Sequence, residues 1–137
     1  MWKYYALLSA FFAGITAVLA KMGLKGINGN VATAIRTTVV LFIAWGIVLA
    51  LGQWKDIKVI SRHNLIFLVL SGIATGLSWI FYFKALETGP VSKVAPIDKL
   101  SVAIAIGLSV IVLHEAIDWK TIAGAALIIT GTLILIR

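Results

Sequence analysis

The chain has 137 residues, of which 61% are hydrophobic and only 12% are charged, and its mean hydropathy is +1.07. A soluble domain carries about 25% charged residues, so the composition indicates an integral membrane protein rather than a soluble domain. The net charge is +7, but the basic residues are scattered singly, which argues against nucleic acid as a partner; the absence of cysteine excludes disulfides and thiolate metal sites.

Apolar runs separated by polar breaks predict five transmembrane spans within a single transmembrane domain covering 1–137. A span needs about 20 mostly apolar residues, and lipid admits only helices or closed barrels. The runs lack the period-two alternation of barrel strands, so we expect an all-α integral membrane protein. The expected spans run from about Tyr4 to Lys21, Val31 to Leu51, Leu65 to Leu86, Val91 to Leu113 and Trp119 to Ile136.

Turn residues support these divisions. Gly89 and Pro90 are expected to end the third helix, since proline cannot continue a helix. Asp118 is a favourable N-cap for the fifth helix. Very few residues connect the fourth span to the fifth, which predicts an antiparallel hairpin.

An odd number of spans places the termini on opposite sides, which we name side A (N-terminal) and side B. The cations of side A are Lys3, Lys55, Lys58, Arg62 and Lys120, and those of side B are Lys21, Lys25, Arg36, Lys84, Lys93 and Arg137. Five against six is almost no positive-inside bias. This balance favours a protein that inserts both ways and pairs with an inverted copy. In the alternative, the Lys55–Arg62 loop dominates and side A is cytoplasmic.

The hexapeptide Pro96–Ser101 lies near the start of the fourth span and contains the adjacent opposite charges Asp98 and Lys99. An ionisable group at membrane depth costs at least ~2.5 kcal/mol, so it is rarely present without a use or a partner. Pro96 also leaves the carbonyl of Ser92 without its helical donor. The bend expected at Pro96 is either a static kink or a hinge for alternating access.

A salt bridge between Arg36 and Asp98 is geometrically available. At ~1.5 Å rise per residue, Arg36 lies about 8 Å inside the second span and Asp98 about 10 Å inside the fourth, both counted from side B. The charged vestibule expected on this side comprises Lys21, Arg36, Lys84, Lys93, Lys99, Glu87 and Asp98. Its cationic excess would favour an anionic group on a substrate. Alternatively, the pair is a folding contact and the lysines snorkel to the interface.

Aromatic and small residues suggest further roles. Trp79 lies far from the span ends and shares a helical face with Tyr82, so both could line a cavity; contact with lipid is the alternative. Gly124 and Gly131 share one face of the fifth span and form a reasonable dimer seam, with internal packing as the alternative.

Catalytic and nucleotide-binding patterns are missing. The sequence has no GxxxxGK[ST], HExxH or GxSxG pattern and no clustered His and Asp ligands. We therefore expect neither an enzyme nor a cofactor or metal.

The chain resembles a single EamA-type repeat of the drug/metabolite transporter superfamily over all five spans. The most specific stretch is WIFYFKALETGPVSKVAPIDKLSVAIAIGLSVIVLHE, residues 79–115. It matches an aromatic third helix, a Lys-Ala-Leu end, a Gly-Pro turn, Pro-x-Asp-Lys-Leu-Ser and a closing Glu. A small-residue first helix with Gly14, Lys21 at its end, and Ala34-Ile35-Arg36 in the second span add to the resemblance.

The resemblance implies one half of a ten-helix transporter, because such transporters usually carry two inverted repeats around a central pathway. One repeat per chain implies an oppositely oriented partner. The seam of Gly124 and Gly131 also resembles the dimerising last helix of the small multidrug resistance proteins. Those proteins keep a glutamate in their first helix for proton coupling, and the first span here has no acid. That departure argues against drug/proton antiport by the same mechanism.

These inferences combine into one functional prediction. We expect an antiparallel homodimer in the lipid of the cytoplasmic membrane that moves, and in particular exports, a small polar or amphipathic metabolite such as an amino acid. The residues expected to line or gate the pathway are Arg36, Trp79, Tyr82, Pro96, Asp98, Lys99 and Ser101. Two alternatives stay open: a flippase for lipid-linked intermediates, and a membrane assembly subunit that does not transport.

Overall fold

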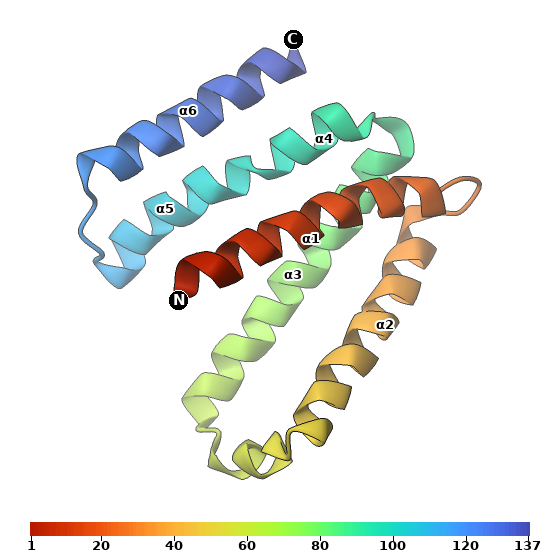
Figure 1. Cartoon of the computed structure of the whole chain (residues 1–137), viewed down its shortest axis with the longest axis vertical. Coiled ribbons are helices and arrows are strands. Elements are labelled where there is room, and N and C mark those ends of the chain that lie inside the picture. Colours follow the sequence, from red (N-terminus) through yellow and green to blue (C-terminus); the bar gives the residue numbers. More distant parts are fainter. The chain divides into compact units, whose positions relative to one another are not determined.

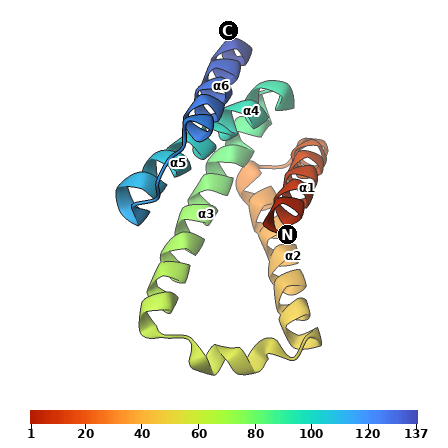
Figure 2. The same cartoon turned by 60° about the vertical axis from the view of Figure 1, so that its left-hand side comes forward.

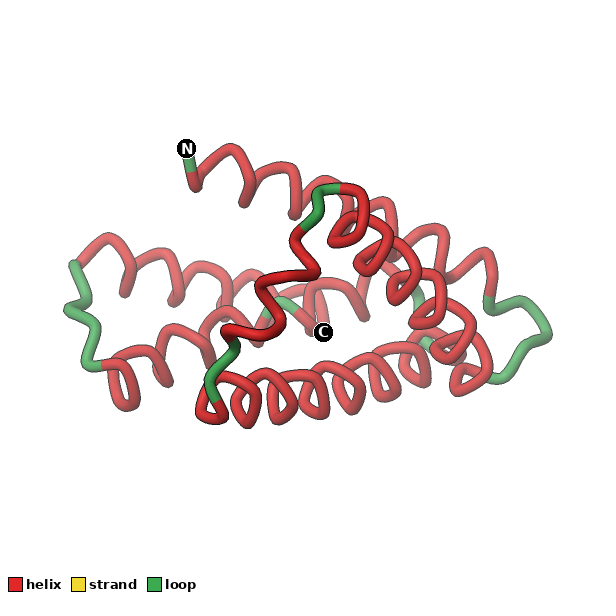
Figure 3. The backbone as a smooth tube through the Cα atoms, turned by 90° about the horizontal axis from the view of Figure 1, so that it is seen from below, coloured by secondary structure: helices red, strands yellow, loops and turns green.

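The computed structural model describes residues 1–137 and consists of helices and their connections (Figure 3). Five helical segments are long and apolar enough to cross a membrane, which confirms the predicted all-α membrane protein with five spans. The elements in chain order are α1 (Trp2–Gly23), α2 (Gly29–Ala50), η1 (Gln53–Val59), α3 (Arg62–Thr88), α4 (Val91–Asp98), α5 (Leu100–Leu113) and α6 (Trp119–Ile136). The first three spans extend two or three residues beyond the expected bounds at every end except the C-terminal end of α2.

The chain divides into two compact units. The α2–α3 unit comprises Leu19–Thr88, and the α4–α6 unit comprises Met1–Val18 together with Gly89–Arg137. Helix α1 begins in the α4–α6 unit and ends in the α2–α3 unit.

The α2–α3 unit is a helical hairpin joined by η1. Gly26 has a φ of +73°, which lets the chain turn tightly between α1 and α2. Asn28 then begins α2 as its N-cap, and its side chain accepts a hydrogen bond from the backbone N–H of Asn30 at 2.9 Å. The hairpin packs around Phe83 and Leu86 of α3, which are 2% and 0% exposed.

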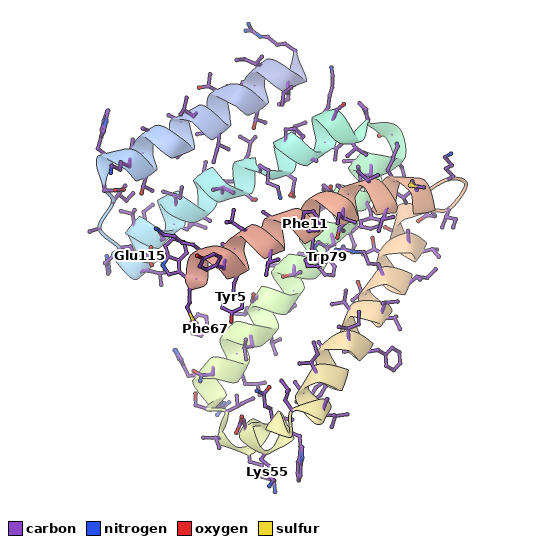
Figure 4. All side chains as sticks on the ribbon, viewed as in Figure 1. Tyr5, Phe11, Lys55, Phe67, Trp79 and Glu115 are labelled. Atoms are coloured by element: carbon purple, nitrogen blue, oxygen red, sulfur yellow. The ribbon has the colours of Figure 1, made fainter.

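Helices α2 and α3 are closest near the start of α2 and diverge towards η1 (Figures 1 and 2). Gly52, with a φ of +69°, provides the left-handed turn that leads from α2 into η1. The short helix η1 spans the distance between the two diverging ends, and Lys55 lies at this tip (Figure 4). The contacts that hold the hairpin together are therefore concentrated at its side-B end.

In the α4–α6 unit, the fourth span is divided into α4 and α5 by an interruption at Lys99. The N–H of Lys99 donates to the carbonyl of Pro96 at 3.0 Å, and the N–H of Val102 donates to the carbonyl of Lys99 at 3.0 Å. Bonds between residues three apart tighten the helix locally into a 3₁₀-type turn. The distortion expected from Pro96 is thus found one turn after the proline, within the predicted hexapeptide.

Helix α6 returns alongside α5 and α4 (Figure 1), so the predicted hairpin is present. Helix α5 ends at His114, whose φ of +54° is left-handed, and the N–H of Glu115 donates to the carbonyl of Ser109 at 3.2 Å. Asp118 then accepts the backbone N–H of Thr121 at 2.9 Å. This bond confirms Asp118 as the N-cap of α6.

Candidate functional site

Arg36 is held against two aromatic rings of α3. Its guanidinium carbon lies 4.2 Å from the centroid of the Trp79 ring and 5.5 Å from that of Phe83. Trp79 and Phe83 are one helical turn apart, so both rings face the same part of α2. A guanidinium at such distances is attracted to the negative faces of the rings, and the attraction strengthens where water is scarce. The two helices thereby fix the position of a cation inside the hairpin.

The same end of the hairpin carries two further charged residues, each with a backbone partner. The carboxylate of Glu87 accepts the N–H of Gly29 at the start of α2. The ammonium of Lys21 donates to the carbonyl of Leu86 near the end of α3. A negative group at a helix N-terminus and a positive group at a C-terminus both satisfy free backbone groups and complement the helix dipole. These contacts give Lys21 and Glu87 a structural role.

A groove of about 400 Å³ lies between α2 and α3, lined mainly by apolar atoms and by Thr33, Thr37 and Thr38. Thr33 donates to the carbonyl of Gly29 at 2.8 Å, Thr37 to that of Thr33 at 2.7 Å, and Thr38 to that of Ala34 at 3.0 Å. Because each hydroxyl proton is used within α2, the hydroxyls offer acceptors rather than donors to the groove.

In the α4–α6 unit, Asp98 and Lys99 form an ion pair at 3.3 Å. Both side chains are substantially exposed in this unit, and an exposed pair of this kind contributes little to stability in water. In hydrocarbon the pair matters more, since pairing reduces the free-energy cost of placing either charge in the membrane. The pair lies at membrane depth, at the point where the fourth span is interrupted.

Thr132 of α6 connects this interruption to the neighbouring helix. Its side chain is 4% exposed, and its hydroxyl lies 3.2 Å from the carbonyl of Pro96 and 2.8 Å from that of Ile128. A hydroxyl has one proton, so it can be donated to either carbonyl or shared between them. A groove of about 430 Å³ adjoins this contact, lined by Pro96, Lys99, Gly131, Thr132 and four apolar residues.

The structure brings some of the predicted site residues together and leaves others apart. Arg36 and Trp79 are in contact, and Tyr82 is half-buried on the same helix. Asp98 and Lys99 pair with each other. Arg36 and Asp98 belong to different units, so their salt bridge stays a prediction. The exposed predicted residues are Lys84, Glu87, Lys93, Lys99 and Ser101.

Sequence reasoning missed Phe83 and Thr132 as site residues. Phe83 follows Trp79 by four positions, and this spacing could have indicated a second ring on the same face. Thr132 follows Gly131 in an ordinary apolar helix, and no local signal distinguishes it from Thr130. Its importance depends on the partner carbonyl of Pro96, which is 36 residues away in the sequence.

Outside the spans, Asp118 has a pKa below its ordinary value. The principal cause is the hydrogen bond from the hydroxyl of Thr121, followed by the one from the Thr121 backbone N–H. Both bonds stabilise the ionised carboxylate. Asp118 therefore acts as a charged cap at neutral pH.

These features define a class: an all-helical integral membrane protein with five spans, with charged side chains held inside two of them. The pattern of the EamA-like transporter family matches residues 1–137, and the chain belongs to that family. Family membership identifies it as a membrane transporter and points away from an enzyme.

The chain is similar to two further proteins, one of which is named as a transporter. A Sinorhizobium protein described as an uncharacterized transporter in the cobO 3′ region is 46% identical over 134 residues, covering 98% of this chain and 95% of that protein. An uncharacterized protein of Methanocaldococcus jannaschii is 26% identical over 83 residues, covering 61% of each chain. No solved structure matches the chain.

Proposed function

We propose that the protein exports small polar or amphipathic metabolites, with amino acids and related zwitterions as the first candidates, across the cytoplasmic membrane. The observation that carries this proposal is the position of Arg36, a permanent cation held against Trp79 within a membrane span. A charged group so placed marks a substrate or ion pathway more often than a packing contact. The transporter family and the transporter-named relative supply the reaction class.

The working unit is proposed to be an antiparallel homodimer. The near-equal numbers of cations on the two sides support insertion in both orientations. Gly124 and Gly131 share one face of α6, and small residues there support a helix–helix seam because they allow close approach of a second helix. The Sinorhizobium relative, of which this chain covers 95%, has a similar length, so it too has room for only one repeat.

Within each copy, Arg36, Asp98 and Lys99 are proposed to line or gate the pathway. Pro96 and the adjoining interruption at Lys99 supply the flexible element, and Trp79 and Tyr82 form part of the wall. Discontinuous helices near substrate sites are a recurrent feature of secondary transporters. The interruption at Lys99 between α4 and α5 supports this assignment.

One observation favours the flippase alternative. The groove beside Pro96 is mostly apolar, and Lys99 lies on its lining. An apolar groove with a cation at one point suits a lipid with an anionic headgroup. Transport of a water-soluble substrate in vesicles separates the two candidates, because a dedicated flippase would leave such a substrate where it was.

The test is transport by purified protein in proteoliposomes, using a panel of labelled amino acids and wild-type, Asp98→Asn and Arg36→Gln proteins. We expect uptake or counterflow of at least one amino acid by the wild type and a strong loss in both variants. Normal folding, dimerisation and transport by both variants would refute the pathway assignment. Recovery of transport when the two charges are exchanged would identify a structural pair instead. An inactive wild type with every substrate would favour an assembly subunit.

A further inference from the structure

The geometry of Arg36 leaves its hydrogen-bonding edges uncommitted within the α2–α3 unit. The guanidinium lies over the Trp79 ring at 4.2 Å and near the Phe83 ring at 5.5 Å. Both contacts involve ring faces, which attract the positive charge but offer no oxygen atom to accept a hydrogen bond from the guanidinium. Phe83 is only 2% exposed, so this aromatic support is fixed in the core of the hairpin. Arginine has five N–H donors in a planar fork, and the stacking leaves them available.

No acidic side chain of this unit neutralises Arg36. The unit contains two acids, Asp56 and Glu87. Glu87 accepts the N–H of Gly29, about 10 Å along α2 from Arg36 at the usual helical rise. Asp56 lies in η1, at the opposite end of the hairpin, where it lines a separate groove with Trp45. Arg36 is therefore a membrane-depth cation to which its own unit supplies aromatic contacts but no carboxylate.

We propose that Arg36 binds the carboxylate group of the transported substrate, with Trp79 and Phe83 holding the guanidinium in position. This inference rests on the proposed transport of small zwitterionic metabolites and names the group that is recognised. A carboxylate matches the planar guanidinium through two parallel hydrogen bonds. A carboxylate also carries a single negative charge, which the single positive charge of Arg36 offsets.

The structural alternative is that the side chain of Asp98 is a permanent partner of Arg36. In that case the guanidinium is already occupied, and a substrate carboxylate gains nothing from it. The two possibilities predict different results for the Asp98→Asn variant. If Asp98 is the permanent partner, a preference for the substrate carboxylate emerges only when Asp98 is removed. If Arg36 binds the substrate, the preference is already present in the wild type.

The test measures binding of L-leucine, L-methionine and L-phenylalanine, each beside its carboxamide, to detergent-purified protein by titration calorimetry. The amide keeps the size and the ammonium group but removes the negative charge, and at about pH 6 both amines are protonated. We expect the wild type to bind at least one amino acid about ten- to a hundredfold more tightly than its amide, the range expected for a charge-assisted hydrogen bond.

The variants assign this preference to Arg36. Arg36→Gln should abolish it, and Arg36→Lys should retain part of it, because lysine keeps the charge but loses the bidentate fork. Trp79→Leu should weaken amino-acid binding severalfold by loosening the guanidinium. Arg62→Gln and Trp45→Leu are the matched controls, since they remove the same residue types elsewhere in the unit and should leave the preference intact.

Several outcomes would overturn the proposal. Equal binding of acid and amide by the wild type, or a preference that survives in folded Arg36→Gln, would each do so. A preference that emerges only in Asp98→Asn would show that Arg36 has an internal partner. If transport into vesicles does not require Arg36 and does not depend on the substrate carboxylate, this inference is wrong, but the proposed transport still stands. If no amino acid either binds or is transported, both proposals fail.

Discussion

At the scale of single residues, Gly29 marks the closest approach of α2 to α3. A Cβ atom built on Gly29 would lie 3.1 Å from the carboxylate oxygen of Glu87 and 3.2 Å from the backbone carbonyl carbon of Phe83. Both distances are tighter than normal packing, and the second involves backbone, which yields poorly. Gly29→Ala should therefore lower the free energy of unfolding by about 1–3 kcal/mol, the usual cost of overpacking. Thermal denaturation in detergent measures this loss.

Gly46→Ala is the matched control, because it makes the same substitution in the same helix where no atom lies within 4 Å of the added carbon. It should leave stability unchanged or raise it slightly through helix propensity. Combining Gly29→Ala with Glu87→Ala should cost less than the sum of the two single effects, since the nearest clashing atom is removed. Equal tolerance of alanine at both glycines would contradict the close approach.

Asp118 gives a pH-dependent prediction. Its pKa in the folded protein is lowered from an ordinary 3.8 by hydrogen bonds from Thr121, so the folded state favours the ionised form. The stabilisation is fully present above the unfolded-state pKa and is lost as the pH falls through the lower, folded-state value. The melting temperature should thus include a component that declines below about pH 4.

Substitutions separate this component from general acid effects. Asp118→Asn keeps a good N-cap without a titratable group, so it should retain most of the neutral-pH stability and lose this part of the acid dependence. Asp118→Ala should be less stable across the neutral range. A melting profile of Asp118→Asn that follows the wild type at every acidic pH would rule out this role.

At the scale of elements, the contact of α6 with the interrupted fourth span predicts a selective role for Thr132. Its hydroxyl is within hydrogen-bonding distance of the Pro96 carbonyl, at 3.2 Å, in a well-buried position. Thr132→Val keeps the shape and removes the hydroxyl. The expected loss of unfolding free energy is about 1 kcal/mol, the order found for hydrogen bonds between membrane helices. Denaturation in detergent gives the size of the effect.

Thr130→Val provides the comparison within the same helix. Thr130 donates only to the carbonyl of Ala126 in its own helix, at 2.8 Å, and is exposed. Its replacement should have little effect, and Thr132→Ser should preserve most of the wild-type stability. If the two valine variants lose the same stability, the link between α6 and the interruption contributes nothing.

The elements were predictable where their determinants are local. Long apolar runs identified five spans, and Asp118 identified the start of α6, because each depends on residues within one or two turns. The contacts of Arg36 were not predictable in this way. They depend on the register of α2 against α3, which joins residues more than 40 positions apart through a long connection. The distortion near Lys99 was expected from Pro96, but the contact of the Pro96 carbonyl with Thr132 of α6 was not predictable from the fourth span alone.

At the scale of the whole molecule, the distribution of cations predicts the orientation in the membrane. Side A carries five cations and side B six, so neither side should be retained in the cytoplasm in every molecule. Reporter domains fused separately to the N- and C-termini should each report both compartments in comparable amounts. A single orientation in all molecules would exclude an antiparallel homodimer, whatever the transported substrate.

The same balance can be shifted deliberately. Lys55 and Lys58 lie in η1, on the loop between α2 and α3, and Lys55 is at its tip (Figure 4). Replacing both with glutamine removes two of the five side-A cations, so side B should become cytoplasmic in most molecules, because short loops rich in cations are retained there. Transport should then fall, because an antiparallel pair needs both orientations. Coexpression with a variant biased to the opposite orientation, for example by added side-A lysines, should restore transport. Restoration by a similarly oriented variant would instead indicate a parallel assembly.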